Sequence, residues 1–139
     1  MGNIQTINKI SYEDMKYCIQ NNILIISVIE KEHETCLIKN TTISFQEEHV
    51  INELYNKKNL STTIIIYGYN CNDNNIIKKY KQLLELGFTK IYIYMGGLFE
   101  WLLLQDIYGD ELFPTTTKEL DILKYKCPQQ FNILMLEAP

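Results

Sequence analysis

Arginine is absent from this 139-residue chain, in which all 13 basic residues are lysine. No side chain can therefore offer the planar, bidentate guanidinium that binds phosphate, sulfate or carboxylate groups. A phosphatase in which an arginine follows the catalytic cysteine is excluded for the same reason. The formal net charge of −4 opposes long-range attraction of a polyanion, so the sequence predicts no nucleic acid partner.

Metal-ligand spacing is also lacking. The four cysteines, Cys18, Cys36, Cys71 and Cys127, form no C-x-x-C pair, and the two histidines are not spaced to join them. We therefore predict no metal site and no cofactor. No signal peptide is recognisable, and no apolar run approaches the roughly 20 residues that cross a bilayer. We expect a cytoplasmic protein with reduced thiols.

Short apolar runs that suit buried strands alternate with patterns typical of helices along the whole chain. The expected strands are 22–29, 41–44, 62–67 and 90–95, and the expected helices are 11–20, 44–54, 74–88 and 98–107. This alternation predicts a single α/β domain with a mainly parallel sheet and helices on both faces.

Three of the expected helices carry signals at their ends. Ser11 with Asp14 and Ser44 with Glu47 are spaced as capping boxes, in which a hydroxyl and an acid satisfy the first amides. Gly87 stands where a glycine commonly ends a helix. These signals place the helix boundaries on the sequence.

Ligands of parallel α/β sheets bind beyond the carboxyl ends of the strands. The polar turn after Tyr67 lies at such an end, and so does the pair Gly96-Gly97. We therefore expect the functional site at these two turns.

The order of motifs in the second half of the chain carries a family resemblance. The segment IIIYGYNCNDNNIIKKYKQLLELGFTKIYIYMGGLFEW contains a helix that closes with Leu86-Gly87-Phe88 and a strand that ends in Gly96-Gly97, shortly before Trp101. It resembles the second half of a rhodanese domain, and residues 10–44 resemble the first half. The resemblance implies the rhodanese-like α/β fold, in which a cysteine after the central strand transfers sulfur.

The resemblance also implies a division of the chain. We expect an N-terminal tail at residues 1–9, a rhodanese-like domain at 10–115, and a C-terminal extension at 116–139 that packs on the domain. Within the extension, apolar residues at 120–125 and 131–136 are suited to packing as helix or strand.

The sequence departs from the family where the family performs its chemistry. Gly68 occupies the position of the nucleophilic cysteine, directly after Tyr67. Ser27 replaces an aspartate that often ends the first buried strand, and the turn after Gly68 contains neither arginine nor a further glycine. These departures predict that ordinary sulfur transfer is lost.

Cys71 is the candidate for a shifted nucleophile. It precedes a predicted helix whose free amides favour a thiolate. Asp73 opposes this role, because its carboxylate at the N-cap would take the same amides and repel a thiolate or persulfide. Cys71 also lies three positions beyond the family's cysteine. Catalysis by Cys71 is therefore the less favoured hypothesis.

The turn itself is suited to binding, because Asn and Asp hydrogen-bond their own backbone and tolerate left-handed conformations. We predict a catalytically inactive binding or regulatory module that recognises a protein partner or a small ligand. A sulfurtransferase that uses Cys71 is an alternative, and a solvated turn without a ligand is the simplest interpretation. The predicted ligand-binding loop comprises Gly68, Tyr69, Asn70, Cys71, Asn72, Asp73 and Asn74.

Two other features suggest weaker hypotheses. The start MGNIQT matches the pattern for N-myristoylation at Gly2, which would make the protein a peripheral membrane adaptor. A membrane partner is expected only if Gly2 is acylated. His33 and His49 are expected to be a solvated loop histidine and an exposed helical one.

Overall fold

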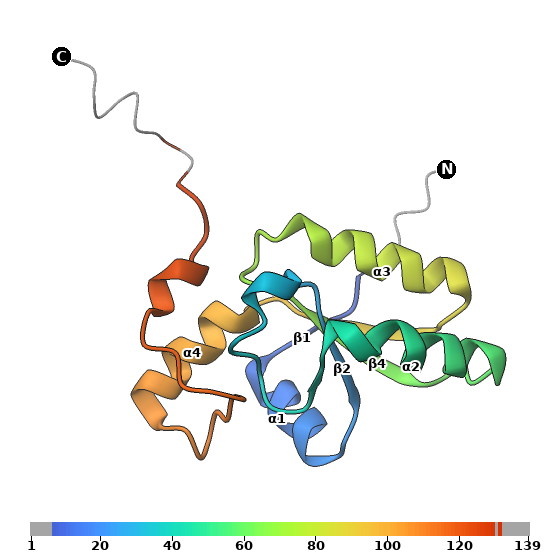
Figure 1. Cartoon of the computed structure of the whole chain (residues 1–139), viewed down its shortest axis with the longest axis horizontal. Helices are drawn as coiled ribbons and strands as arrows, with labels where there is room; N and C mark the ends of the chain where they lie inside the picture. The colour runs from blue at the N-terminus through green and yellow to red at the C-terminus, as the bar shows by residue number, and fades with distance from the viewer. Residues whose placement is uncertain (1–6, 130, 132–139) are drawn as a thin grey trace.

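A parallel sheet of five strands, in the order β1-β5-β4-β2-β3, forms the centre of the molecule (Figure 1). The computed structural model describes residues 7–129 and 131. The strands are β1 (Lys9–Ile10), β2 (Leu24–Ser27), β3 (Thr41–Thr42), β4 (Thr63–Tyr67) and β5 (Lys90–Tyr94). The α/β architecture with a parallel sheet is therefore confirmed.

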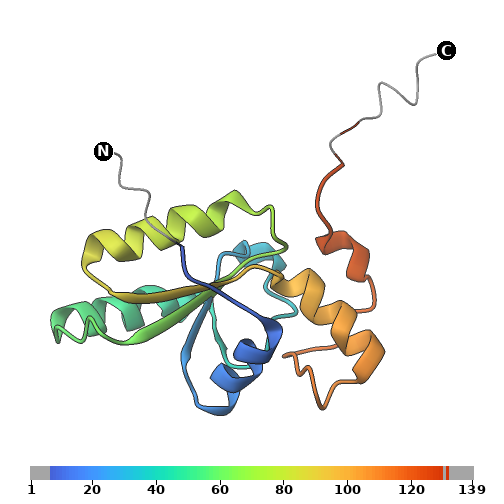
Figure 2. The ribbon, with the colours of Figure 1, turned by 180° about the vertical axis from the view of Figure 1, so that it is seen from behind.

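Helices cover both faces of this sheet, as the sequence predicts (Figure 2). Two lie together on one face and two on the other. The first pair is α2 (Ser44–Asn56) and α3 (Asn74–Leu86), and the second is α1 (Tyr12–Gln20) and α4 (Gly97–Tyr108). Two short 3₁₀ turns, η1 (Lys31–His33) and η2 (Ile122–Tyr125), lie in the connecting segments.

The central strand β4 supplies both cores because successive side chains of a strand point to opposite faces. Ile64 and Ile66 belong to the core under α2 and α3. Ile65 and Tyr67 belong to the core under α1 and α4. All four side chains are at most 1% exposed, which explains the unbroken apolar composition of this strand.

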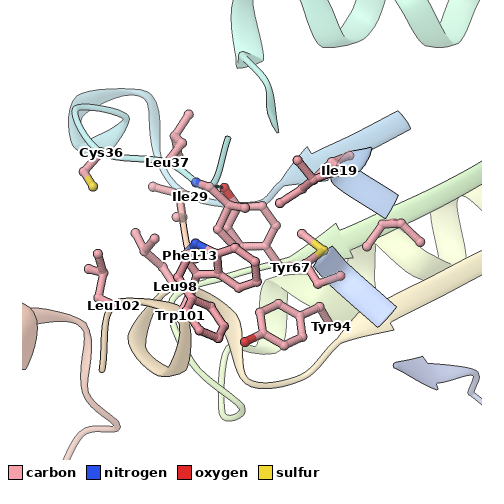
Figure 3. Close-up of a cluster of buried hydrophobic side chains, with 14 of the residues drawn as sticks. Ile19, Ile29, Cys36, Leu37, Tyr67, Tyr94, Leu98, Trp101, Leu102 and Phe113 are labelled. Atoms are coloured by element: carbon pink, nitrogen blue, oxygen red, sulfur yellow. Dashed lines mark hydrogen bonds between the residues drawn. The ribbon is translucent and has the colours of Figure 1, made fainter. Parts of the chain in front are cut away.

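The core under α4 is rich in aromatic side chains (Figure 3). The ring of Trp101 meets Phe113 edge-on at 5.0 Å between centroids, and Tyr94 at 6.1 Å. The indole Nε1 of Trp101 donates to the carbonyl oxygen of Pro114 at 3.0 Å. Trp101 is therefore a core residue, and it fastens the chain beyond α4 to the domain.

Tyr67 ends the central strand with a buried hydroxyl that is fully bonded. The amide of Ile38 donates to it at 3.1 Å, and Thr41 Oγ1 lies 2.7 Å away. Thr41 itself donates to the carbonyl of Ile38 at 2.6 Å, which leaves Tyr67 to donate to Thr41. Burial raises the pKa of Tyr67, so the phenol stays neutral. The hydroxyl thereby ties β4 to the short edge strand β3.

The helix ends confirm two sequence predictions and correct a third. The capping box of Ser11 and Asp14 is present, and Gly87 ends α3 with a positive φ of 106°. The capping box predicted for Ser44 and Glu47 is wrong, because Ile43 is the N-cap of α2. The amide of Ser44 donates to the Glu34 carboxylate at 3.0 Å, so an acid from the preceding loop satisfies this helix start.

The chain beyond α4 returns across the domain. The amide of Thr116 donates to the carbonyl of Leu37 at 2.8 Å, and η2 lies against α4. Tyr125, the last residue of η2, is 2% exposed. The apolar segment 131–136 lies outside the described residues, apart from Phe131. Within residues 7–129 and 131, no helix combines the length and apolar character that crossing a membrane requires.

Candidate functional site

The loop between β4 and α3 lies against the start of α4. The amides of Leu98 and Phe99 donate to the carbonyl oxygens of Gly68 and Tyr69, each at 2.9 Å. Gly97 adopts a φ of +67°, and a Cβ atom there would lie 2.7 Å from the carbonyl oxygen of Gly68. Only glycine allows this backbone approach. The turn at Gly96-Gly97 therefore shapes the loop rather than forming a separate site.

Asp73 closes the loop from within. It is the N-cap of α3, and its Oδ1 accepts from the amide of Asn75 at 3.0 Å. Its Oδ2 accepts from the amide of Tyr69 at 3.2 Å. The carboxylate thus uses the amides that a bound anion would need, as the sequence analysis expects.

The same carboxylate fills the space beside Gly68. A Cβ atom built on Gly68 would lie 2.5 Å from Asp73 Oδ2 and 3.0 Å from Val28 Cγ2. Contacts below 3.0 Å force something to move. A cysteine side chain at position 68 therefore does not fit this loop while Asp73 keeps its place.

Cys71 lies on the surface of the loop, beside Cys127. Its side chain is exposed, and its Sγ lies 3.8 Å from the Sγ of Cys127. The hydrogen bond with Cys127, followed by partial desolvation, raises the pKa of Cys71. A nucleophilic cysteine needs the opposite shift, which a cation or a helix N-terminus would supply.

Asn70 joins the loop to the C-terminal segment. Its side chain is 7% exposed. Its Nδ2 donates to the carbonyl oxygen of Tyr125 at 2.9 Å, and its Oδ1 accepts from the amide of Asn72 at 2.8 Å. This asparagine therefore holds both the shape of the loop and the position of η2.

Tyr69 stands between two partners from distant parts of the chain. Its ring stacks on Tyr125 at 5.9 Å between centroids with an interplanar angle of 21°. Its hydroxyl lies 2.7 Å from Nδ1 of His33. Partial burial raises the pKa of Tyr69. The side chain of His33 is 58% exposed, as expected of a solvated histidine, and it contacts Tyr69 in addition. The side chain of His49 is 83% exposed, also as expected.

These elements enclose a cleft of about 960 Å³, a volume within the range of small-molecule sites. One wall carries the acids Glu30 and Glu32, and the lysines of the cleft are Lys78, Lys124 and Lys126. Five residues of the predicted loop line the cleft, namely Tyr69, Asn70, Asn72, Asp73 and Asn74. Among the described residues Cys71 and Gly68 are not part of this lining.

Sequence reasoning missed the walls that η1 and η2 contribute. The contact of Asn70 with Tyr125 joins residues 55 positions apart, and that of His33 with Tyr69 joins residues 36 apart. No local pattern marks such pairs. Gly2 lies outside the described residues. Within 7–129 and 131, no group of three or more His, Cys, Asp or Glu side chains is placed to hold a metal ion.

A parallel sheet in this strand order, with a loop and a helix start at the carboxyl end of its central strand, defines an α/β domain whose candidate site lies where parallel sheets bind their ligands. A family model described as the rhodanese-like domain matches residues 16–104. The chain belongs to the rhodanese-like family.

Solved structures from several organisms share this fold. A yeast protein tyrosine phosphatase of the rhodanese family is 15% identical, with a TM-score of 0.59 over 86% of this chain and 99% of that one. A rhodanese-like domain from Anabaena is 17% identical, with a TM-score of 0.57 over 92% of both chains. At these identities the likeness establishes the fold alone. Among curated proteins, none matches the chain significantly.

Proposed function

We propose that this rhodanese-like domain does not transfer sulfur and instead binds a protein partner or small polar ligand in the cleft beside residues 69–74. The position of the Asp73 carboxylate carries the proposal. It fills the space in which a cysteine side chain at position 68 would begin, and it accepts the two amides that would hold an anionic sulfur. A persulfide or thiosulfate there would meet a negative charge and find no guanidinium.

The surroundings of Cys71 support the same proposal. Its thiol is exposed, points towards Cys127 and has a raised pKa. Because the hydrogen bond with Cys127 raises the pKa of Cys71 above its ordinary value, this thiol ionises less readily than a free peptide thiol. A nucleophile in that state is a poor acceptor of sulfur.

Sulfurtransferase assays test the inactive state directly. We expect the purified chain to form no thiocyanate from thiosulfate and cyanide above the level of its Cys71→Ser variant. Iodoacetamide should label Cys71 no faster near pH 6 than it labels a free peptide thiol. Turnover that disappears in Cys71→Ser, together with preferential labelling near pH 6, would establish Cys71 as a shifted nucleophile.

Because both acids and lysines line the cleft, it suits a polar ligand that is neutral or that carries a positive and a negative group. The cleft is lined by the acids Glu30, Glu32 and Asp73 together with lysines, and its asparagine carboxamides can pair with peptide groups. The aromatic pair Tyr69 and Tyr125 adds an apolar surface. A peptide segment of a partner protein offers this combination of groups.

Binding can be located with a library of short peptides and amide chemical shifts. We expect the peptides that bind to shift the amides of Tyr69, Asn72 and Asn74. The groove between α2 and α3, which Glu48 and Gln82 line, provides an internal control. If the peptides change the amide shifts of residues in the control groove, or of neither place, the proposal that the cleft binds a ligand is contradicted.

A further inference from the structure

Two cysteines from distant parts of the chain meet at the edge of the loop. Cys71 and Cys127 are 56 positions apart in sequence, and their Sγ atoms lie 3.8 Å apart. Cys71 is exposed and Cys127 is partly exposed, whereas Cys18 and Cys36 are buried. The pair is therefore accessible to small oxidants from solvent, unlike the other two thiols.

The contact between these thiols follows from how the C-terminal segment is held. Asn70, which precedes Cys71, donates to the carbonyl oxygen of Tyr125 at 2.9 Å. The rings of Tyr69 and Tyr125 stack immediately beside the pair. Pro128 restricts the backbone of the preceding Cys127 to extended conformations. Hydrogen bonding, stacking and backbone restriction thus bring both cysteines together before any bond forms.

We propose that Cys71 and Cys127 are a redox-active pair that closes into a disulfide and fastens the C-terminal segment to the loop after β4. The proposal is independent of any ligand in the cleft. Disulfide formation requires the sulfurs to approach from 3.8 Å to about 2.05 Å, which rotation of the exposed Cys71 side chain can supply.

Glutathione disulfide is a sufficient oxidant for this step. The thiolate of Cys71 attacks one sulfur of glutathione disulfide, which forms a mixed disulfide and releases one glutathione thiolate. The thiolate of Cys127 then attacks Sγ of Cys71, closes the protein disulfide and releases the second glutathione. The two protein thiols lose two electrons and two protons in total, and the two glutathione molecules gain them.

Formation of the Cys71–Cys127 disulfide would hold one side of the cleft in place. Lys124, Tyr125 and Lys126 all line the cleft and lie just before Cys127. Once Cys127 is bonded to Cys71, this segment cannot move away from Tyr69. The bond also closes a long loop, which reduces the number of conformations open to the unfolded chain. It should therefore stabilise the folded state.

Mass spectrometry of the oxidised full-length chain tests the proposal. After incubation with glutathione disulfide, we expect peptide mapping to show a Cys71–Cys127 link within one chain. Thermal melting should rise by about 5–15 °C relative to the reduced chain. Trypsin should cut after Lys124 and Lys126 more slowly in the oxidised form, and dithiothreitol should reverse all three effects.

Variants separate the pair from general effects of oxidation. Cys71→Ser and Cys127→Ser should each abolish the link and the thermal shift, whereas Cys18→Ala should retain both. Stable glutathione adducts at Cys71 without an internal link, links between chains, or an unchanged melting temperature after closure would each overturn the proposal. Peptide mapping of the unaltered chain decides the matter even if a variant folds poorly.

Discussion

Two neighbouring helices that begin at the carboxyl edge of the sheet, α3 and α4, satisfy amides near their starts in different ways. At the start of α3, a side chain does so, because the Asp73 carboxylate accepts from the amide of Asn75 in the helix, and also from the amide of Tyr69 in the preceding loop. At the start of α4, the backbone does so, because the amides of Leu98 and Phe99 donate to carbonyls of the neighbouring loop. Each of these named amides therefore already has a hydrogen-bond acceptor within the chain.

The difference determines how each helix start can be changed. The bonds of Asp73 depend on one carboxylate, so a single substitution removes them. The bonds at α4 depend on the close approach that Gly97 permits, so substitution there displaces the whole loop. When a side chain accepts the hydrogen bonds at a helix start, one substitution can remove them. When backbone carbonyls accept them, the bonds change only if the backbone moves.

The largest expected effect follows from disturbing the backbone contact at α4. Gly97→Ala should lower the free energy of unfolding by about 3 kcal/mol, because the added Cβ combines a positive φ with a 2.7 Å approach to a carbonyl oxygen. Gly87→Ala is the matched control, with a φ of +106° and only a leucine methyl 3.1 Å away. It should cost about 1 kcal/mol in the same urea titration. Equal losses in both variants would show that the contact with the loop is unimportant.

The next effect comes from placing a cysteine at position 68, where the resemblance to the family predicts one. Gly68→Cys should cost about 2 kcal/mol and confer no sulfur transfer, because the Asp73 carboxylate fills the space. In a double-mutant cycle measured by urea unfolding, Gly68→Cys should cost about 1 kcal/mol less in the Asp73→Gly background than in the original chain. Strictly additive changes would mean that the two positions do not compete for space.

The smallest effect is expected from removing the carboxylate alone. Asp73→Ala should destabilise the domain by about 1.5 kcal/mol, since it loses an N-cap and the bond to the Tyr69 amide. Asp73→Asn should lose roughly half as much, because its amide oxygen still caps α3. Ser11→Ala in α1 gives the cost of an ordinary cap for comparison, by thermal melting of all three variants. A larger loss for Ser11→Ala would contradict the special role of Asp73.

The sequence alone predicted the fold because local signals agree with the tertiary structure in most elements. The apolar run of β4 predicts a strand that is buried on both faces, and the amphipathic pattern of α3 predicts a helix that is buried on one face. Both are observed. The start of α2 was mispredicted because its partner, Glu34, comes from a preceding loop. The capping-box spacing compares residues only three positions apart, so it cannot predict a partner ten positions away.

The candidate site was predicted only in part. The sequence predicts that Gly68 stands at the position of the family's cysteine, and it places Asp73 at a helix start, where the structure has it as the N-cap of α3. It does not show that the Asp73 carboxylate occupies the space beside Gly68, because that depends on the path of the loop. The approach of Cys127 to Cys71 and the stacking of Tyr125 on Tyr69 depend on how the C-terminal segment returns.

The buried hydroxyl of Tyr67 makes alkali a selective denaturant of this core. Its pKa in the folded chain lies above the ordinary value of 10.0, so the folded state holds a proton that the unfolded chain releases. The stability from this burial is complete below pH 10 and declines as the pH rises further. Burial raises the pKa of Tyr94 in the same core as well, so in a spectrophotometric titration Tyr67 and Tyr94 should ionise only as this core opens, after the exposed tyrosines.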